Sequence, residues 1–302
     1  MKNIKPFPFL LGVLLIALLC FVLKVGLFDS SPPTHSQDQK IKVVASFYPI
    51  YFFAAQIGGD RVEVKNITPS GAEPHDYEPT ARDLAGIENS NLLILNGGNL
   101  EAWGNKIKDN LSGGKVVVIT AGDGLITQDA HVWLDPILAK KEAQNIAQGL
   151  IKIDPRGSSY FENNLKILEI KFDKLDNDYR NGLINCEEGN IITSHAAFGS
   201  LAARYGLKQI SIAGLSPDEE PSPQKMAEIV KFAKDNNIKY IFFEGLVSPK
   251  LSETIATEVG AKTLVLDPIE GISEEGMQKG KDYFSIMEDN LKNLKEALQC
   301  TK

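Results

Sequence analysis

The sequence is poor in the residues and motifs that mark common enzyme and binding sites. Its 302 residues include only three cysteines and four histidines. It has no Cys-x-x-Cys, no His-Glu-x-x-His, no Gly-x-Ser-x-Gly and no glycine-rich phosphate loop, which argues against the best-known zinc, hydrolase and nucleotide sites. Its 32 basic residues are outnumbered by 39 acidic ones, so the net charge is −7. Nucleic-acid binding is therefore disfavoured, because phosphates attract clustered positive charge.

The N-terminus carries the longest apolar run. Lys2 and Lys5 precede it, and residues 6–23 would span about 27 Å as a helix, close to the thickness of a bilayer core. We predict an uncleaved membrane anchor at residues 1–28 and a polar tether at 29–40, with the rest of the chain outside the cytoplasmic membrane. A cleaved signal and a lipidated Cys20 are the alternatives, although Leu18 and Leu19 stand where a lipoprotein signal needs small residues.

The remaining chain has the composition of a folded protein and is long enough for two lobes, with 43% hydrophobic and 24% charged residues. Short β-branched runs alternate with helical patterns, which is typical of α/β units with mainly parallel strands. The expected strands cover residues 41–46, 62–67, 91–96, 115–120, 190–194, 208–212, 240–243 and 262–266. Four strands in each half predict two (β/α)4-type lobes, at residues 41–154 and 186–302.

Residues 155–183 have no strand character. Apolar residues recur there every three or four positions, from Phe161 to Leu183, with charges on the opposite face. This pattern predicts one long helix of about 43 Å. Because it lies between the two sets of strands, we expect residues 155–185 to form a rigid linker between the lobes.

Three of the four histidines follow expected strands. His75 comes after the second strand, His131 after the fourth and His195 after the fifth, while His35 lies in the tether. Asp267 directly follows the eighth strand. Ligands of open α/β sheets bind beyond the carboxyl ends of the strands. Three imidazoles and a carboxylate from both lobes therefore predict a metal site in the cleft between them, suited to Zn²⁺, with Mn²⁺ possible.

The sequence also resembles a known family, the substrate-binding proteins of zinc and manganese ABC importers. The resemblance covers residues 41–298, and its motifs are Ala45-Ser46-Phe47-Tyr48-Pro49, Glu73-Pro74-His75-Asp76-Tyr77-Glu78-Pro79, His131-Val132-Trp133-Leu134-Asp135-Pro136, Ser194-His195-Ala196-Ala197-Phe198, Glu220-Pro221-Ser222-Pro223 and Leu266-Asp267-Pro268. The resemblance implies two lobes joined by a long helix, an ABC permease as partner, and metal binding at the positions of His75, His131, His195 and Asp267. We expect a monomeric capture protein that is not an enzyme.

Two departures from the family pattern bear on the metal. Zinc members often carry a histidine- and acid-rich loop before the position of His131, but residues 122–130 contain no histidine. Manganese members usually have glutamate at the position of His195, so histidine there favours Zn²⁺. A manganese-specific protein of the same family remains the alternative.

Some roles stay open at the level of sequence. Glu244, after the seventh strand, is either a capping or surface acid or a hydrogen-bond partner of a metal-binding histidine. Asp135, before Pro136, is expected to cap a helix. Cys186 and Cys300 are either free thiols or a disulfide. A zinc metallohydrolase and a surface adhesin are the rival functions, and the hydrolase would need an open metal position for water.

Overall fold

The first of two parallel sheets forms the N-terminal half of the body. The structure, a computed structural model, describes residues 40–301, which belong to one compact unit. β1 (Ile41–Ala45) and β3 (Leu92–Leu95) form the centre of the sheet, between β2 (Val62–Asn66) and β4 (Val117–Thr120), in the order β2-β1-β3-β4. All pairs are parallel. Every residue of β3 is buried, as expected for a central strand covered on both faces.

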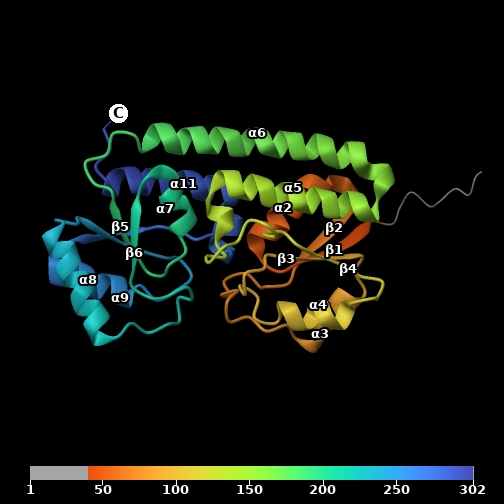
Figure 1. Ribbon diagram of the computed structural model, residues 1–302, viewed down its shortest axis with the longest axis horizontal. Helices are drawn as coiled ribbons and strands as arrows, with labels where there is room; N and C mark the ends of the chain where they lie inside the picture. The colour runs from red at the N-terminus through yellow and green to blue at the C-terminus, as the bar shows by residue number, and fades with distance from the viewer. Residues whose placement is uncertain (1–39, 302) are drawn as a thin grey trace, which may run out of the picture. The chain divides into compact units, whose positions relative to one another are not determined.

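The second sheet repeats this plan. β5 (Asn190–Thr193), β6 (Lys208–Ser211), β7 (Tyr240–Phe243) and β8 (Lys262–Val265) pair in parallel in the order β6-β5-β7-β8. The predicted α/β architecture with two four-stranded lobes is therefore confirmed (Figure 1). We call the part that contains β1–β4 the first lobe and the part that contains β5–β8 the second lobe. The exact lobe boundaries remain a prediction.

Helices cover both sheets. They are α2 (Tyr48–Gly58), α3 (Ala81–Glu88), α4 (Gly104–Leu111), α5 (Pro136–Ile153), α6 (Ser158–Gly182), α7 (Gly199–Tyr205), α8 (Pro223–Asp235), α9 (Lys250–Val259), α10 (Glu274–Gln278) and α11 (Tyr283–Ala297), with short 3-10 turns at Gly59–Arg61, Val132–Leu134 and Pro155–Gly157. Asp135 caps α5, as predicted, because its carboxylate accepts hydrogen bonds from the backbone N–H groups of Ile137 and Leu138.

The helix predicted between the lobes is α6. It starts three residues later than expected, because Pro155 opens a 3-10 turn first. Its apolar stripe, which includes Phe161, Phe172 and Tyr179, is buried. In Figure 1 this helix runs along both lobes, and it contacts α2 and α5 in the first lobe and α11 in the second.

The lobes share more than this helix. One hydrophobic core includes residues of both sheets, and Tyr283 at the start of α11 packs against Phe52 and Phe53 of α2. Trp133 donates a hydrogen bond through its indole Nε1 to the carbonyl of Pro268 over 2.7 Å, and Tyr283 donates to the carbonyl of Trp133. The two lobes are therefore held together by a shared core and by hydrogen bonds as well as by α6.

A disulfide links Cys186 to Cys300. It joins the segment after α6 to the segment after α11, where the two residues also form an isolated antiparallel bridge. Of the two alternatives left open by the sequence, the paired state is the one present. Within residues 40–301 no helix is long and apolar enough to cross a membrane. The predicted anchor, the tether and His35 lie outside the described residues.

Candidate metal centre

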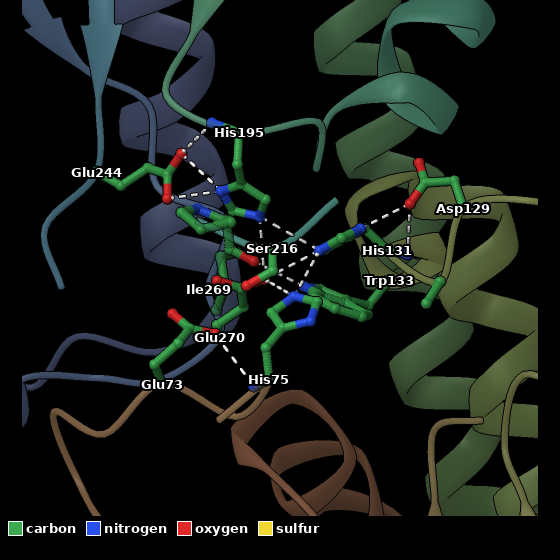
Figure 2. Close-up of polar contacts among 12 residues, drawn as sticks. Glu73, His75, Asp129, His131, Trp133, His195, Ser216, Glu244, Ile269 and Glu270 are labelled. Carbon is green, nitrogen blue, oxygen red and sulfur yellow. Dashed lines mark hydrogen bonds and ion pairs between the residues drawn. The ribbon is translucent and has the colours of Figure 1, made fainter. Parts of the chain in front are cut away.

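Four side chains from four different loops meet at the carboxyl ends of the two sheets. His75 lies in the loop after β2 and His131 precedes the 3-10 turn before α5, so both belong to the first lobe. His195 follows β5 and Glu270 follows β8, so both belong to the second. Figure 2 shows the three imidazole rings and the Glu270 carboxylate converging on one point. The site therefore joins the two lobes.

The nitrogen and oxygen atoms of this group are close enough to share one ion. The Nε2 atom of His131 is 3.2 Å from Nε2 of His75 and 3.3 Å from Nε2 of His195. Oε1 of Glu270 is 3.0 to 3.3 Å from these three nitrogens. All four donor atoms lie within 4.8 Å of one another. Three imidazoles and one carboxylate match the four tetrahedral ligands that Zn²⁺ prefers.

The fourth residue of the group differs from the sequence prediction. The structure brings His75, His131 and His195 together as predicted, but the carboxylate among them belongs to Glu270, and Asp267 is not a member of the group. Asp267 instead accepts a hydrogen bond at Oδ1 from the backbone N–H of Ile269 over 2.7 Å. Ile269 has a positive φ of 58°, so the chain turns sharply after β8 and directs the next residue into the site.

Two of the imidazole rings are held by hydrogen bonds between carboxylates and Nδ1, the ring nitrogen that faces away from the site. Oδ1 of Asp129 accepts from Nδ1 of His131 over 2.6 Å, and both carboxylate oxygens of Glu244 lie 2.8 Å from Nδ1 of His195. Each of these carboxylates also accepts a hydrogen bond from the backbone N–H of the same histidine. This contact leaves Nε2 free to face the site, the arrangement typical of metal-binding histidines.

Sequence reasoning singled out Glu244 but missed Asp129. The available signal was the spacing Asp129-Ala130-His131, in which an acidic residue stands two positions before a histidine. His75 differs from the other two imidazoles. It is the one member of the group that is not buried, and its loop borders solvent. Of the four side chains, that of His75 is therefore the nearest to solvent.

The buried acidic groups change the protonation of the metal-free site. Burial alone would lower the pKa of His195, but hydrogen bonds to Glu244 and Glu270 outweigh it and raise the pKa to about 10. The pKa of His131 is also raised, because hydrogen bonds to Asp129 and Glu270 outweigh burial. Burial would raise the pKa of Glu270, but hydrogen bonds to the three histidines hold it well below its usual range. In the metal-free site, protons on His131 and His195 therefore supply the positive charge that a bound cation would otherwise supply.

Comparison with known proteins agrees with this geometry. Residues 43–297 match the model of the family described as zinc-uptake complex component A, periplasmic (ZnuA). The chain belongs to this family. It is 39% identical to the high-affinity zinc uptake system protein ZnuA of Bacillus subtilis, over 92% of this chain and 95% of that protein. It is 38% identical to the zinc-binding lipoprotein AdcA of Streptococcus pneumoniae, over 94% of this chain but only 60% of AdcA.

Solved structures of ZnuA-like proteins have the same fold. The zinc-bound ZnuA-like domain of Streptococcus pneumoniae AdcA matches with a TM-score of 0.78 at 39% identity, over 86% of this chain and 99% of that domain. The laminin-binding protein Lmb of Streptococcus agalactiae, described as both adhesin and metal transporter, matches with a TM-score of 0.79 at 35% identity, over 85% of this chain and 99% of that protein. The ZnuA-family match runs from β1 to α11 and so includes His75, His131, His195 and Glu270.

Proposed function

We propose that this chain captures Zn²⁺ outside the cytoplasmic membrane and delivers it to the permease of an ABC transporter. The observation that carries the proposal is the convergence of His75, His131, His195 and Glu270, whose donor atoms all lie within 4.8 Å of one another. Such a set fills a tetrahedral coordination sphere with protein atoms. A catalytic zinc needs an open position for water, so these ligands favour capture and release over hydrolysis.

A zinc titration with single-site variants tests this proposal. We expect the parent chain, stripped of metal, to bind one equivalent of Zn²⁺, and His131→Ala and His195→Ala to bind it at least 100-fold more weakly while remaining folded. Lys108→Ala, on the exposed part of α4, serves as the matched control and should bind as the parent does. Unchanged zinc affinity in His195→Ala would rule out a site that joins the two lobes.

We further propose that Zn²⁺ is preferred over Mn²⁺. Imidazole nitrogen binds Zn²⁺ better than Mn²⁺, and the site offers three imidazoles to one carboxylate. His195→Glu should shift the preference toward Mn²⁺ because it replaces a nitrogen with a second carboxylate. Competition calorimetry with both ions on the parent and on His195→Glu measures this shift. Equal or stronger Mn²⁺ binding by the parent would refute the zinc assignment and leave the site itself intact.

We also propose that the protein acts as a monomer held at the outer face of the membrane through residues 1–28. The support for the anchor is the lysine-flanked apolar run, together with the absence of small residues at positions 18 and 19. Mass spectrometry of the membrane-extracted protein distinguishes the alternatives. A mass that corresponds to a chain retaining residues 1–28, with or without Met1, supports the anchor. A mass that corresponds to a chain beginning at an acylated Cys20 contradicts it.

A further inference from the structure

The two lobes meet beside the metal centre, where α7 of the second lobe lies against the segment that carries His131. α7 contacts the 3-10 turn Val132–Leu134, which directly follows this histidine. The helix begins at Gly199, four residues after His195. One short stretch of the second lobe therefore holds a metal-binding histidine and also contacts the segment of another.

Gly199 leaves room for the carboxylate that orients His131. Oδ1 of Asp129 accepts hydrogen bonds from the backbone N–H and from Nδ1 of His131, over 2.9 and 2.6 Å. The other oxygen, Oδ2, is buried and has no hydrogen-bond partner within residues 40–301. A Cβ atom added to Gly199 would lie 3.0 Å from Oδ2, a separation tighter than nine in ten Cβ contacts in proteins, so one of the two groups would have to move. Figure 2 shows Asp129 on the far side of the His131 ring from the other metal-binding residues.

Gln209 of β6 holds His195 in a related way. Its Nε2 donates to the carbonyl of His195 over 2.9 Å and to the hydroxyl of Thr193 over 2.7 Å. That hydroxyl donates to the same carbonyl over 2.8 Å. The position of an added Cβ atom at Gly199 is also 3.9 Å from Oε1 of Gln209. The side chains that hold the two histidines therefore meet at Gly199.

We propose that Gly199 and Gln209 are positioning residues of the zinc site, which couple the orientations of two metal-binding histidines in different lobes. This inference rests on the proposed zinc binding. Neither residue is one of the four metal-binding residues. Gln209 fixes the backbone of His195, and Gly199 admits the Asp129 carboxylate. A side chain at position 199 would push this carboxylate against His131, and the short hydrogen bond to Nδ1 would transmit the displacement to Nε2.

The backbone does not itself require glycine at this position. The φ angle of Gly199 lies outside the left-handed region, and the residue is the first of a helix. Alanine is a better helix former than glycine, so the backbone alone would leave the stability of Gly199→Ala unchanged or increased. A loss of zinc affinity in this variant would therefore come from crowding of Asp129.

A double-mutant cycle tests the contact between Gly199 and Asp129. Chelator competition measures Zn²⁺ affinity in the parent, in each single variant and in the double variant. Asp129→Ala should lower the affinity 10- to 100-fold and Gly199→Ala by about tenfold. Added to Asp129→Ala, Gly199→Ala should cost nothing further, because the crowded group is gone. The matched control is Gly86→Ala in α3, where an added Cβ atom would lie 3.7 Å from Nζ of Lys65, an ordinary contact; it should bind as the parent does.

The visible spectrum of the Co²⁺-loaded chain provides a readout that a general loss of stability would not change. Co²⁺ is another divalent ion that imidazole ligands bind, and it absorbs strongly in the visible range when its coordination is tetrahedral. At full metal occupancy, Gly199→Ala should show weaker and shifted absorption bands, whereas Gly86→Ala should match the parent.

Gln209→Met covers the case in which Gly199→Ala does not fold. It keeps the length of a partly exposed side chain and removes both hydrogen bonds that Gln209 donates. We expect zinc affinity to fall about tenfold and the Co²⁺ spectrum to change. Gln224→Met, at an exposed position of α8, is the matched control.

The same titrations separate this inference from the proposed function. A parent chain that binds no Zn²⁺ would refute the proposed function. If the parent binds Zn²⁺ but Gly199→Ala and Gln209→Met keep its affinity and its Co²⁺ spectrum, the positioning role is wrong. An equal loss from Gly199→Ala with and without the Asp129 side chain would also overturn it, because the effect would not pass through that carboxylate.

Discussion

At the scale of single residues, the difference between Asp267 and Glu270 shows where sequence reasoning reached its limit. The rule that ligands follow strand ends selects Asp267, the second residue after β8. The structure instead uses the Asp267 carboxylate to hold the turn, through its hydrogen bond to the backbone of Ile269. A β-branched residue with positive φ is uncommon, so neither the turn nor its consequence for Glu270 can be read from the sequence.

The two carboxylates should therefore respond differently to substitution. Glu270→Ala removes a donor atom that lies within 3.3 Å of three imidazole nitrogens, and we expect zinc affinity to fall on the order of 100-fold or more. Asp267→Asn keeps the hydrogen bond that Ile269 donates and should change zinc affinity less than tenfold. Competition with a chromophoric chelator measures both variants. If Asp267→Asn lowered zinc affinity more than Glu270→Ala did, Asp267 would be the fourth ligand.

A substitution at Glu244 tests the hydrogen bonds that orient the metal-binding histidines. Its carboxylate holds Nδ1 of His195 and so directs Nε2 toward the metal. Loss of such a partner typically reduces metal affinity 10- to 100-fold, so we expect Glu244→Gln to weaken zinc binding by about that factor. Glu88→Gln is the exposed control. If Glu244→Gln binds zinc as tightly as the control, the carboxylate has only a structural role.

The protonation of His195 predicts how zinc binding and stability depend on pH. In the metal-free chain its pKa is about 10, above the usual 6.5, so its proton stabilises the folded state fully below pH 6.5, and this contribution is lost as the pH rises toward 10. Zn²⁺ must displace that proton. We therefore expect zinc affinity to keep rising from pH 6.5 to 9, where the unperturbed value for histidine would predict a plateau.

Chelator competition and thermal unfolding between pH 6 and pH 9 measure these two effects. The Tm of the metal-free chain should fall over this range, and the Tm of the zinc-loaded chain should fall less because zinc has replaced the proton. Glu244→Gln removes one of the two carboxylates that raise the pKa of His195, so it should move both transitions to lower pH. A constant zinc affinity above pH 7 would show that His195 is neutral in the metal-free protein.

At the scale of helices and strands, the sequence was informative wherever the pattern is local. The eight expected strands all occur, with ends displaced by at most two residues, because β-branched runs bounded by turns indicate strand formation directly. The linker helix was recognised from its periodicity. The disulfide could not be settled in this way, because the pairing of Cys186 with Cys300 depends on α6 and α11 lying side by side.

This disulfide should stabilise the second lobe. It spans 114 residues of sequence, and in the chain-entropy model closing a loop of that length stabilises the folded state by about 5 kcal/mol. Cys186→Ser with Cys300→Ser should therefore lower the Tm by about 10 °C. Zinc stoichiometry should remain one, because neither cysteine belongs to the metal-binding group. A change in Tm of less than 2 °C would mean that the bridge constrains little of the unfolded chain.

At the scale of the whole body, the lobes are tied together near the metal centre as well as through α6. The indole of Trp133 in the first lobe donates to Pro268 in the second, and its ring lies 5.1 Å from that of His131. A further ion pair joins Arg204 of α7 to Asp135, the residue that caps α5. A periodic pattern identifies which face of a helix is buried but not its partner, so these contacts between lobes could not be predicted.

These contacts predict that zinc binding moves the lobes little. Opening the cleft widely would separate Trp133 from Pro268 and break up a hydrophobic core shared by both lobes, at a cost of several kcal/mol.

We expect the radius of gyration, measured by small-angle X-ray scattering, to change by less than about 1 Å on zinc binding, whereas hinge proteins close by rigid-body rotation. Hydrogen exchange should slow mainly in the loops at residues 69–79, 122–131 and 267–273, which contain His75, His131 and Glu270. Trp133→Phe removes the hydrogen bond to Pro268 and keeps a smaller aromatic ring in its place, so it should enlarge both changes. A contraction of several ångströms in the parent, or protection spread evenly over both lobes, would instead show that the shared core opens in the metal-free protein.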